Sequence, residues 1–260
     1  MDAQRRMVSS LDLVLVACAG MAAGTINAIA GGGTLVTFPL LTAIGLPAVA
    51  ANVTSTVALW PGFLGSTFAQ RTDLVGQEGR LKVVLPIGAA GGVVGGLLLL
   101  AGGESVFRAL IPYLLMSASL LLAAQDRLRA WLAARTWHST GGRAAERKAA
   151  VFIGIGAVYG GYFGAGLSVI MLAVLGLLLD ESLTRVNALK SALGLTINIA
   201  AALFFIFSGS VMWPVVIIMA IGALAGGVIG GKIAAKIAPS TLKWTVVTIG
   251  MIVSIGYFLR

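Results

Sequence analysis

Residues 13–70 contain no Asp, Glu, Lys or Arg, and residues 149–179 form a second uncharged stretch. Both exceed the roughly 20 apolar residues that one helix needs to cross a bilayer. Only 10% of the chain is charged, whereas a soluble domain carries about 25% charged residues. The alternation of polar and apolar residues that is typical of a membrane barrel is absent from the sequence. The sequence therefore predicts an all-α, polytopic membrane protein.

The two halves of the chain resemble each other. GGVVGG at 91–96 falls on GGVIGG at 226–231 when the first half is shifted by 135 residues, and Asn52 then falls on Asn187. Each half contains five apolar segments, at 11–30, 34–46, 49–69, 83–101 and 105–124, and at 151–163, 167–179, 186–208, 212–231 and 241–259. We expect a first transmembrane repeat over 1–124, a basic cytoplasmic linker over 125–150 and a second repeat over 151–260.

An odd number of segments in each half predicts that the second repeat is inverted relative to the first. With the N-terminus outside, the inner loops are 70–82, 125–150, 180–190 and 232–243, and they hold most of the 18 Lys and Arg residues. This distribution follows the positive-inside rule. Arg5 and Arg6, directly before the first apolar segment, favour the opposite orientation, and the larger count decides between the two.

Glycines separate the first apolar segment of each half from the second, in NAIAGGGTLV at 27–36 and YFGAGLS at 162–168. The pieces that follow are too short to cross a bilayer upright, which predicts half-helices or re-entrant segments that meet at the midplane. A duplicated glycine interruption is a pointer to the binding site of a transporter. Backbone N–H groups at the start of each second piece would attract an anion, and these positions are Gly32, Gly33 and Thr34, and Gly166, Leu167 and Ser168. Gly164, in the second glycine motif, is a further candidate for the substrate site.

Few polar residues lie within the apolar segments, and they form two candidate sets. Asn27, Asn52 and Ser55 would supply amide and hydroxyl groups from the first half. Asn187, Lys190 and Asn198 share one helical face in the second half. A lysine inside an apolar span is expensive and often marks a substrate path, although a lysine at a helix end can also extend to the interface. No carboxylate lies deep in a segment, so these donors favour an anionic substrate.

Glycines spaced four apart form a further pattern, at Gly88, Gly92 and Gly96 and again at Gly222, Gly226 and Gly230. A dinucleotide-binding loop would need a strand before the glycines, and no strand is predicted there. Close packing between membrane helices is the preferred interpretation.

Several function classes are disfavoured by the composition. The net charge of +9 lies in predicted loops and no soluble basic domain exists, so we expect membrane lipid and no nucleic acid as a partner. One cysteine and one histidine predict neither a disulfide nor a metal site. A lipoprotein-type signal ending at Cys18 would remove most of a segment that the second half matches. No nucleophile and base pair is visible, so we expect no enzyme and no cofactor.

At the same residues the sequence resembles the TauE/SafE sulfite exporter family of the toluenesulfonate uptake permease superfamily. The resemblance is carried by NAIAGGGTLVTFPLL, AANVTS, YGGYFGAGLS and NALKSALGLTINIAAALFFIFSG, and covers nearly the whole chain. It implies a transporter of sulfite, sulfoacetate or other organosulfonates in the bacterial inner membrane. Family members often carry an acidic residue near the glycine motifs, where this chain has Asn27 and Gly160. An importer of sulfonates or carboxylates, an anion-selective channel and a homodimer remain open.

Overall fold

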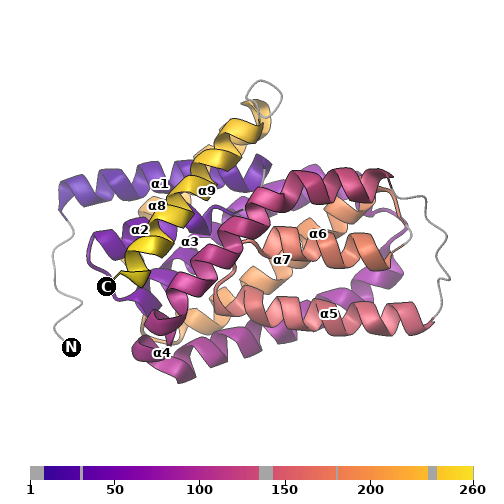
Figure 1. Cartoon of the computed structure of the whole chain (residues 1–260), viewed down its shortest axis with the longest axis horizontal. Helices are drawn as coiled ribbons and strands as arrows, with labels where there is room; N and C mark the ends of the chain where they lie inside the picture. The colour runs from indigo at the N-terminus through magenta and orange to yellow at the C-terminus, as the bar shows by residue number, and fades with distance from the viewer. Residues whose placement is uncertain (1–8, 30–31, 135–142, 180, 234–238, 260) are drawn as a thin grey trace.

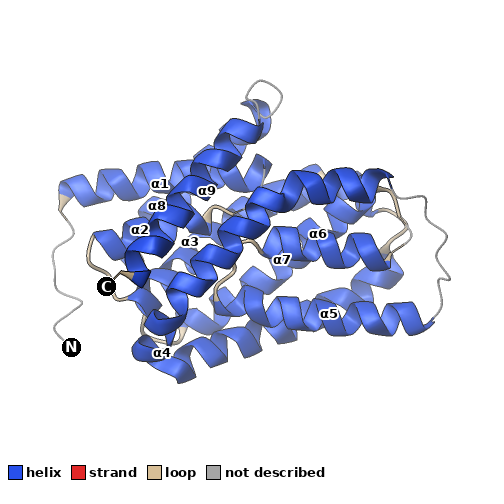
Figure 2. Cartoon of the chain, in the orientation of Figure 1, coloured by secondary structure: helices blue, strands red, loops and turns tan. Residues whose placement is uncertain are grey.

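The computed structural model describes residues 9–29, 32–134, 143–179, 181–233 and 239–259, and every regular element within these ranges is helical (Figures 1 and 2). The elements are α1 (Ser10–Ile29), α2 (Thr34–Ala43), α3 (Ala48–Ala69), the short 3-10 helix η2 (Arg71–Leu74), α4 (Glu78–Ala134), α5 (Arg143–Tyr162), α6 (Leu167–Leu178), α7 (Leu183–Ile206), α8 (Trp213–Ile233) and α9 (Pro239–Phe258). The predicted all-α architecture is confirmed, and the predicted segments correspond to these helices.

Helix α4 contains two of the predicted segments. Gly103 has φ of 67° and ψ of −172°, a conformation that interrupts the helix between the two segments. By length and composition, the described parts of α1, α4 and α7 are each able to cross a bilayer. The predicted linker at 125–150 is largely helical, because α4 continues to Ala134 and α5 begins at Arg143; residues 135–142 lie outside the described residues.

The glycine pattern packs helices against each other. A Cβ atom added to Gly222 or Gly226 of α8 would lie 2.4 or 1.9 Å from a backbone carbonyl oxygen of α1, at Ala17 or Met21. In the first half, a Cβ on Gly92 would lie 2.6 Å from the carbonyl oxygen of Ile197 in α7. Only glycine allows backbones to approach this closely, so the predicted packing role is confirmed at these positions.

The first helix of each half packs against a helix of the other half. Helix α1 packs along α8, with Ala17 opposite Gly222 and Met21 opposite Gly226, so the two helices are parallel. The corresponding pair in the other half is α5 with the first part of α4, where Gly95 contacts Val158. This second pair is also parallel, because Gly91, one turn earlier on α4, contacts residues one turn earlier on α5.

Helices that the 135-residue shift relates to each other pack antiparallel. Gln70 at the end of α3 bonds to Ser191 near the start of α7, while Phe63 lies against Gly194 further along. The second part of α4 and α9 are related in the same way, because Pro112 accepts from Ser254 and Ser119 lies against Gly250.

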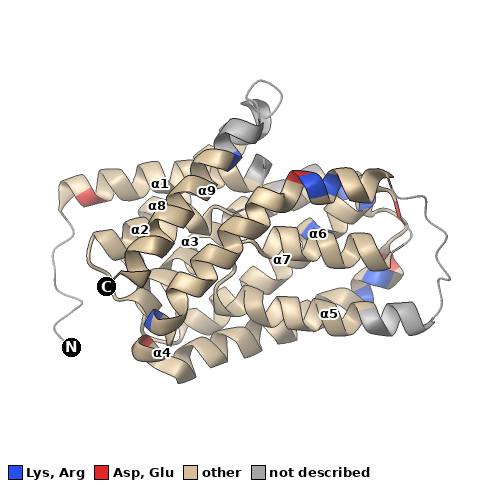
Figure 3. Ribbon diagram, viewed as in Figure 1, with Lys and Arg blue, Asp and Glu red and all other residues tan. Residues whose placement is uncertain are grey.

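The two ends of the molecule differ in charge, as Figure 3 shows. We call the end where α4 finishes and α7 begins the basic end, and the end that holds Gly103 and the start of α3 the kink end. Described Lys and Arg residues gather at the basic end (Figure 3), whereas Arg108 lies at the kink end beside Glu104. Helix α1 begins and α9 ends at the kink end (Figure 1). This arrangement agrees with the predicted placement of the basic loops on one side.

A cluster of buried aromatic rings lies where α2, α4 and the turn that follows α5 meet. The rings of Phe38, Phe107 and Phe163 are almost completely buried, and Phe38 contacts the other two edge to face, with centroids 6.0 and 5.5 Å apart. Such edge-to-face pairs add to the stabilisation from burial. The three rings, which we call the phenylalanine cluster, lie next to both glycine interruptions on the side of the kink end.

Candidate functional site

The first glycine break separates α1 from α2. Gly32 has φ of 103°, which a residue with a side chain rarely adopts, and Gly33 is the N-cap of α2. The backbone N–H of Gly33 donates to Oδ1 of Asn27 at 2.8 Å. The side chain of Asn27 therefore links the end of α1 to the start of α2. In this conformation the N–H group of Gly33, which was predicted to face an anion, already donates a hydrogen bond to Asn27. Thr34 is half-buried in the first turn of α2.

The second break separates α5 from α6 and has no asparagine in the corresponding role. Gly164 and Gly166 have φ of 79° and 76°, and Ser168 lies half-buried in the first turn of α6. The hydroxyl group of Tyr159 donates to the carbonyl oxygen of Ala165 at 2.6 Å and holds the loop. The two breaks thus share their glycines but are stabilised by different side chains.

Both breaks lie against one face of the second part of α4. A Cβ on Gly32 would lie 3.3 Å from a side-chain carbon of Leu122, and one on Gly166 would lie 3.3 Å from the Cα of Ala118. Ala118 and Leu122 are four residues apart, which is about one helical turn. The structure therefore brings the two breaks together from opposite halves of the chain.

Helix α3 connects the breaks through two buried polar residues. Asn52 donates through Nδ2 to the carbonyl oxygen of Tyr162 at 2.9 Å, directly before the second break, and its Oδ1 is buried without a hydrogen-bond partner. The Ser55 hydroxyl lies 2.6 Å from the hydroxyl of Thr37 in α2. Asn198 instead donates to Gly194 of its own helix at 2.8 Å. Asn198 is thus committed to local backbone in this conformation.

Asn187 and Lys190 lie in a second group at the basic end. Asn187 donates through Nδ2 to Oε1 of Gln70 at 2.6 Å, and Gln70 donates to the hydroxyl of Ser191 at 3.2 Å. Gln70 is 18 residues beyond Asn52 along α3, a helical distance of about 27 Å. Apart from Asn198, the predicted site residues therefore form two groups. The break group comprises those of the two breaks and of α3, around Ala118 and Leu122, and the basic-end group comprises Asn187 and Lys190.

Arg129 belongs to the basic-end group and was missed by the sequence prediction. Its Nη2 donates to Oδ1 of Asn187 at 3.3 Å. The prediction ended the fifth segment at 124 and assigned the following arginines to the linker. Ala118, Leu122 and Arg129 recur at helical spacing, so continuing the face of Leu122 for two more turns would have identified it.

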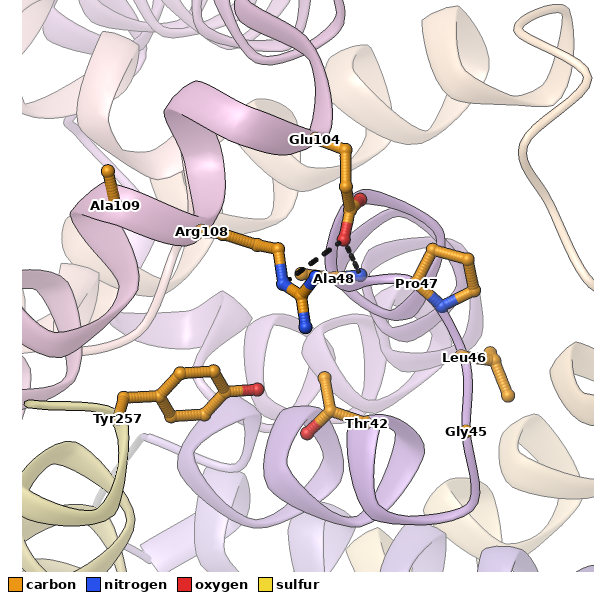
Figure 4. Close-up of a pocket in the computed structure, with 9 residues that line it drawn as sticks. All are labelled: Thr42, Gly45, Leu46, Pro47, Ala48, Glu104, Arg108, Ala109 and Tyr257. Atoms are coloured by element: carbon orange, nitrogen blue, oxygen red, sulfur yellow. Dashed lines mark hydrogen bonds and ion pairs between the residues drawn. The ribbon is translucent and has the colours of Figure 1, made fainter. Parts of the chain in front are cut away.

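Glu104 was also missed by the sequence prediction, and it joins α4 to the start of α3 at the kink end. Its two carboxylate oxygens accept from the backbone N–H groups of Ala48 and Val49 at 2.7 and 2.9 Å, at the N-terminus of α3. Figure 4 shows Glu104 and Arg108 beside a pocket of about 800 Å³, with the hydroxyl groups of Tyr257 and Thr42 directed toward the same space. Arg108 lies 3.9 Å from Glu104 and is largely exposed. The kink end thus carries an open pocket with one cation.

The break group contains hydrogen-bonding groups and no charge. Within the described ranges, no carboxylate bonds to Asn27, Asn52 or Ser55, and no cluster of three His, Cys, Asp or Glu residues could hold a metal ion. Such a site is chemically suited to bind a ligand through hydrogen bonds and helix ends rather than to perform acid–base chemistry.

Comparison with known proteins relates nearly the whole chain to membrane transporters. The profile of a family described as "Sulfite exporter TauE/SafE" matches residues 16–257. A probable membrane transporter protein of Haemophilus influenzae is 27% identical over 221 residues, which is 82% of each chain. The probable membrane transporter protein YfcA of Escherichia coli K12 is 27% identical over 85% of this chain and 80% of its own length. A Sinorhizobium protein, probable membrane transporter protein ORF9, is 28% identical over 82% and 80%. No solved structure matches the chain.

Proposed function

The chain belongs to the TauE/SafE sulfite exporter family, and from this membership and the site geometry we propose that it exports small anions as a secondary transporter. The family and the related membrane transporters establish a multi-pass membrane transporter. The finer assignment is ours: the substrates are sulfite, sulfoacetate or other organosulfonates, and the location is a bacterial inner membrane. Import of sulfonates or carboxylates is the second candidate for direction and substrate.

One observation carries the proposal, namely that both breaks lie against a single helical turn of α4. Ala118 contacts the second break and Leu122 the first, although the breaks lie more than 100 residues apart in the chain. Paired broken helices near the midplane form substrate sites in transporters built from inverted repeats. The antiparallel packing of α3 with α7 supports such an inverted pair. We therefore place the substrate beside Ala118 and Leu122.

The chemistry of the break group favours an anion. Helix N-termini carry partial positive charge, and α2 and α6 both begin at the breaks. Asn52 and Ser55 add amide and hydroxyl groups on α3. A cation site would need carboxylate or several carbonyl ligands, and no described carboxylate bonds to the break group. A sulfonate or sulfite, which offers three oxygen acceptors, suits these donors.

The phenylalanine cluster favours a transporter over an anion channel. Phe38, Phe107 and Phe163 fill the space next to the breaks on the side of the kink end. A channel requires a continuous polar path, whereas alternating access requires one side to be closed. Flux that saturates at low substrate concentration would support the transporter, and large single-channel currents would support the channel.

The membrane potential supplies sufficient driving force for export. An anion that leaves an inside-negative cell gains about 2.3 kcal/mol per charge per 100 mV, enough for roughly a 50-fold outward gradient of a monovalent anion. Lys190 would act as a fixed countercharge for the substrate. Flux of a strong-acid sulfonate, whose charge does not change over the pH range used, should therefore follow an imposed potential in liposomes and should not respond to a pH gradient.

The proposal is tested by reconstituting the full chain in liposomes and measuring uptake of radiolabelled sulfite and of methanesulfonate. Gly166→Leu should abolish flux, because the side chain would enter the space between the second break and Ala118. Since Gly166→Leu could also disturb folding, Ser168→Ala serves as the milder variant and should reduce flux severalfold. Gly65→Ala on α3 is the control, because an added Cβ there meets no atom within 4 Å.

Wild-type levels of flux in both Gly166→Leu and Ser168→Ala would remove the second break from the substrate site. Absence of flux for every sulfur oxyanion in the wild-type protein, under an imposed potential, would contradict the proposed substrate class.

A further inference from the structure

Two cations of the basic-end group lack a carboxylate partner in the described part of the chain. Arg129 and Lys190 form no ion pair there, and Lys190 lies one helical turn after Asn187, the residue that Arg129 contacts. The nearby carboxylates are engaged elsewhere. Asp126 pairs with Lys243, and Glu181 pairs with Arg80 at 2.6 Å and with Arg185 at 2.9 Å.

The guanidinium of Arg129 has an unused donor. Its Nε is buried and has no hydrogen-bond partner, while Nη2 donates to Asn187. Asn187 is itself held by Gln70, so the amide oxygen that receives Nη2 cannot rotate away without losing a 2.6 Å bond. A guanidinium fixed on one side, with a free N–H on another edge, is prepared for an acceptor that can take two hydrogen bonds.

Two adjacent cations without a counter-ion are unfavourable in a partly buried site, because their repulsion is only weakly screened there. A bound anion would remove the repulsion and would also satisfy Nε of Arg129. Two positive charges match a doubly charged anion better than a singly charged one. The expected ligand therefore carries two negative charges on oxygen atoms.

The position of this pair connects it with the break group. Arg129 follows Leu122 by seven residues, two turns along the same face of α4, which is about 10 Å. Lys190 precedes Asn198 by eight residues on α7, which is about 12 Å. An anion held by the pair would thus lie on the basic-end side of the breaks.

We propose that Arg129 and Lys190 together form an oxyanion site at the basic end that prefers doubly charged anions. A substrate would bind there on its way between the basic end and the glycine breaks. The inference rests on the proposed function for the statement that the anion is a transport substrate. The site itself stands on the two unpaired cations. Sulfite in its dianionic form and sulfoacetate are ligands of the expected class.

The experiment compares sulfate, which is always a dianion near neutral pH, with methanesulfonate, a monoanion with a similar oxygen arrangement. Binding of each to the purified full chain is measured by isothermal titration calorimetry at constant ionic strength. The wild-type protein should bind sulfate more tightly than methanesulfonate. Arg129→Gln should weaken sulfate binding at least about tenfold and remove the preference. Arg129→Lys should retain part of it.

Arg127→Gln is the matched control, because Arg127 lies on the same helix, is exposed, and should leave both affinities unchanged. Sulfate binding that is equally tight in wild type and Arg129→Gln would overturn the proposal, as would a wild-type protein that binds neither anion. If flux through the breaks occurs while Arg129→Gln keeps the dianion preference, the site is wrong and the proposed function stands. If Arg129-dependent sulfate binding occurs without any transport of sulfur oxyanions, the proposed function is wrong and the site stands.

Discussion

Neighbouring glycines in α8 allow a sharp test of how the halves are held together. A Cβ on Gly226 would lie 1.9 Å from the carbonyl oxygen of Met21, where ordinary contact begins at 3.4 Å. A Cβ on Gly227 would meet no atom within 4 Å. We therefore predict that Gly226→Ala destabilises the protein and that Gly227→Ala does not.

The magnitude follows from the packing of α1 on α8. To admit the methyl group the helices must separate, and forcing an extra carbon into a packed interface costs about 1–3 kcal/mol. Separation also stretches the bond from Thr25 Oγ1 to the carbonyl oxygen of Gly226, now 3.0 Å, and interhelical bonds in membranes contribute about 0.6 kcal/mol. The higher helix propensity of alanine stabilises the helix by at most about 1 kcal/mol, which offsets part of this loss. For Gly227→Ala only this gain remains.

The two variants are compared by the temperature at which the detergent-solubilised monodisperse protein is lost on size-exclusion chromatography. Gly226→Ala should melt several degrees below wild type, and Gly227→Ala at or slightly above it. Equal melting of the two variants would refute the assignment of close α1–α8 packing to Gly226.

Two further predictions concern the kink end and the orientation of the chain. Glu104→Ala removes two charge-assisted bonds, to the backbone N–H groups of Ala48 and Val49, so it should cost about 1–3 kcal/mol and lower the melting temperature. Arg108→Ala should change stability by less than about 0.5 kcal/mol, because its ion pair is long and exposed, and equal effects of the two substitutions would contradict the capping role. On a Cys18→Ser background, a membrane-impermeant maleimide added to intact cells should label Ser210→Cys and should not label Thr72→Cys. Labelling of Thr72→Cys alone would reverse the orientation.

Much of the fold could be predicted from local sequence. Uncharged length determines which segments are helical, because an unpaired peptide group is too costly in an apolar environment. The positions of both breaks followed from their glycines, and Gly32, Gly164 and Gly166 have a positive φ that glycine adopts without strain. The packing role of Gly222 and Gly226 followed from their spacing, which places them on one helical face.

The site could be predicted only in part, because its geometry depends on which distant residues meet. Asn187 was selected from its polarity, but its partners Gln70 and Arg129 lie 117 and 58 residues away along the chain. Asn27 was expected to serve a ligand, whereas the fold places its amide oxygen on the N–H of Gly33. A polar residue in an apolar segment needs a hydrogen-bond partner. The sequence of that segment does not specify whether the partner is backbone, another side chain or a ligand.

The sequence by itself determined the number of segments, the two glycine interruptions and the concentration of basic residues in particular loops, since these follow from hydropathy and backbone freedom. Only the tertiary structure decided that Ala118 and Leu122 bring both breaks to one turn of α4. It also decided that Glu104 caps α3 and that the Arg129 guanidinium contacts Asn187, one turn before Lys190. These contacts join segments that are far apart in the chain, and their geometry arises from the packing of whole helices rather than from any local propensity.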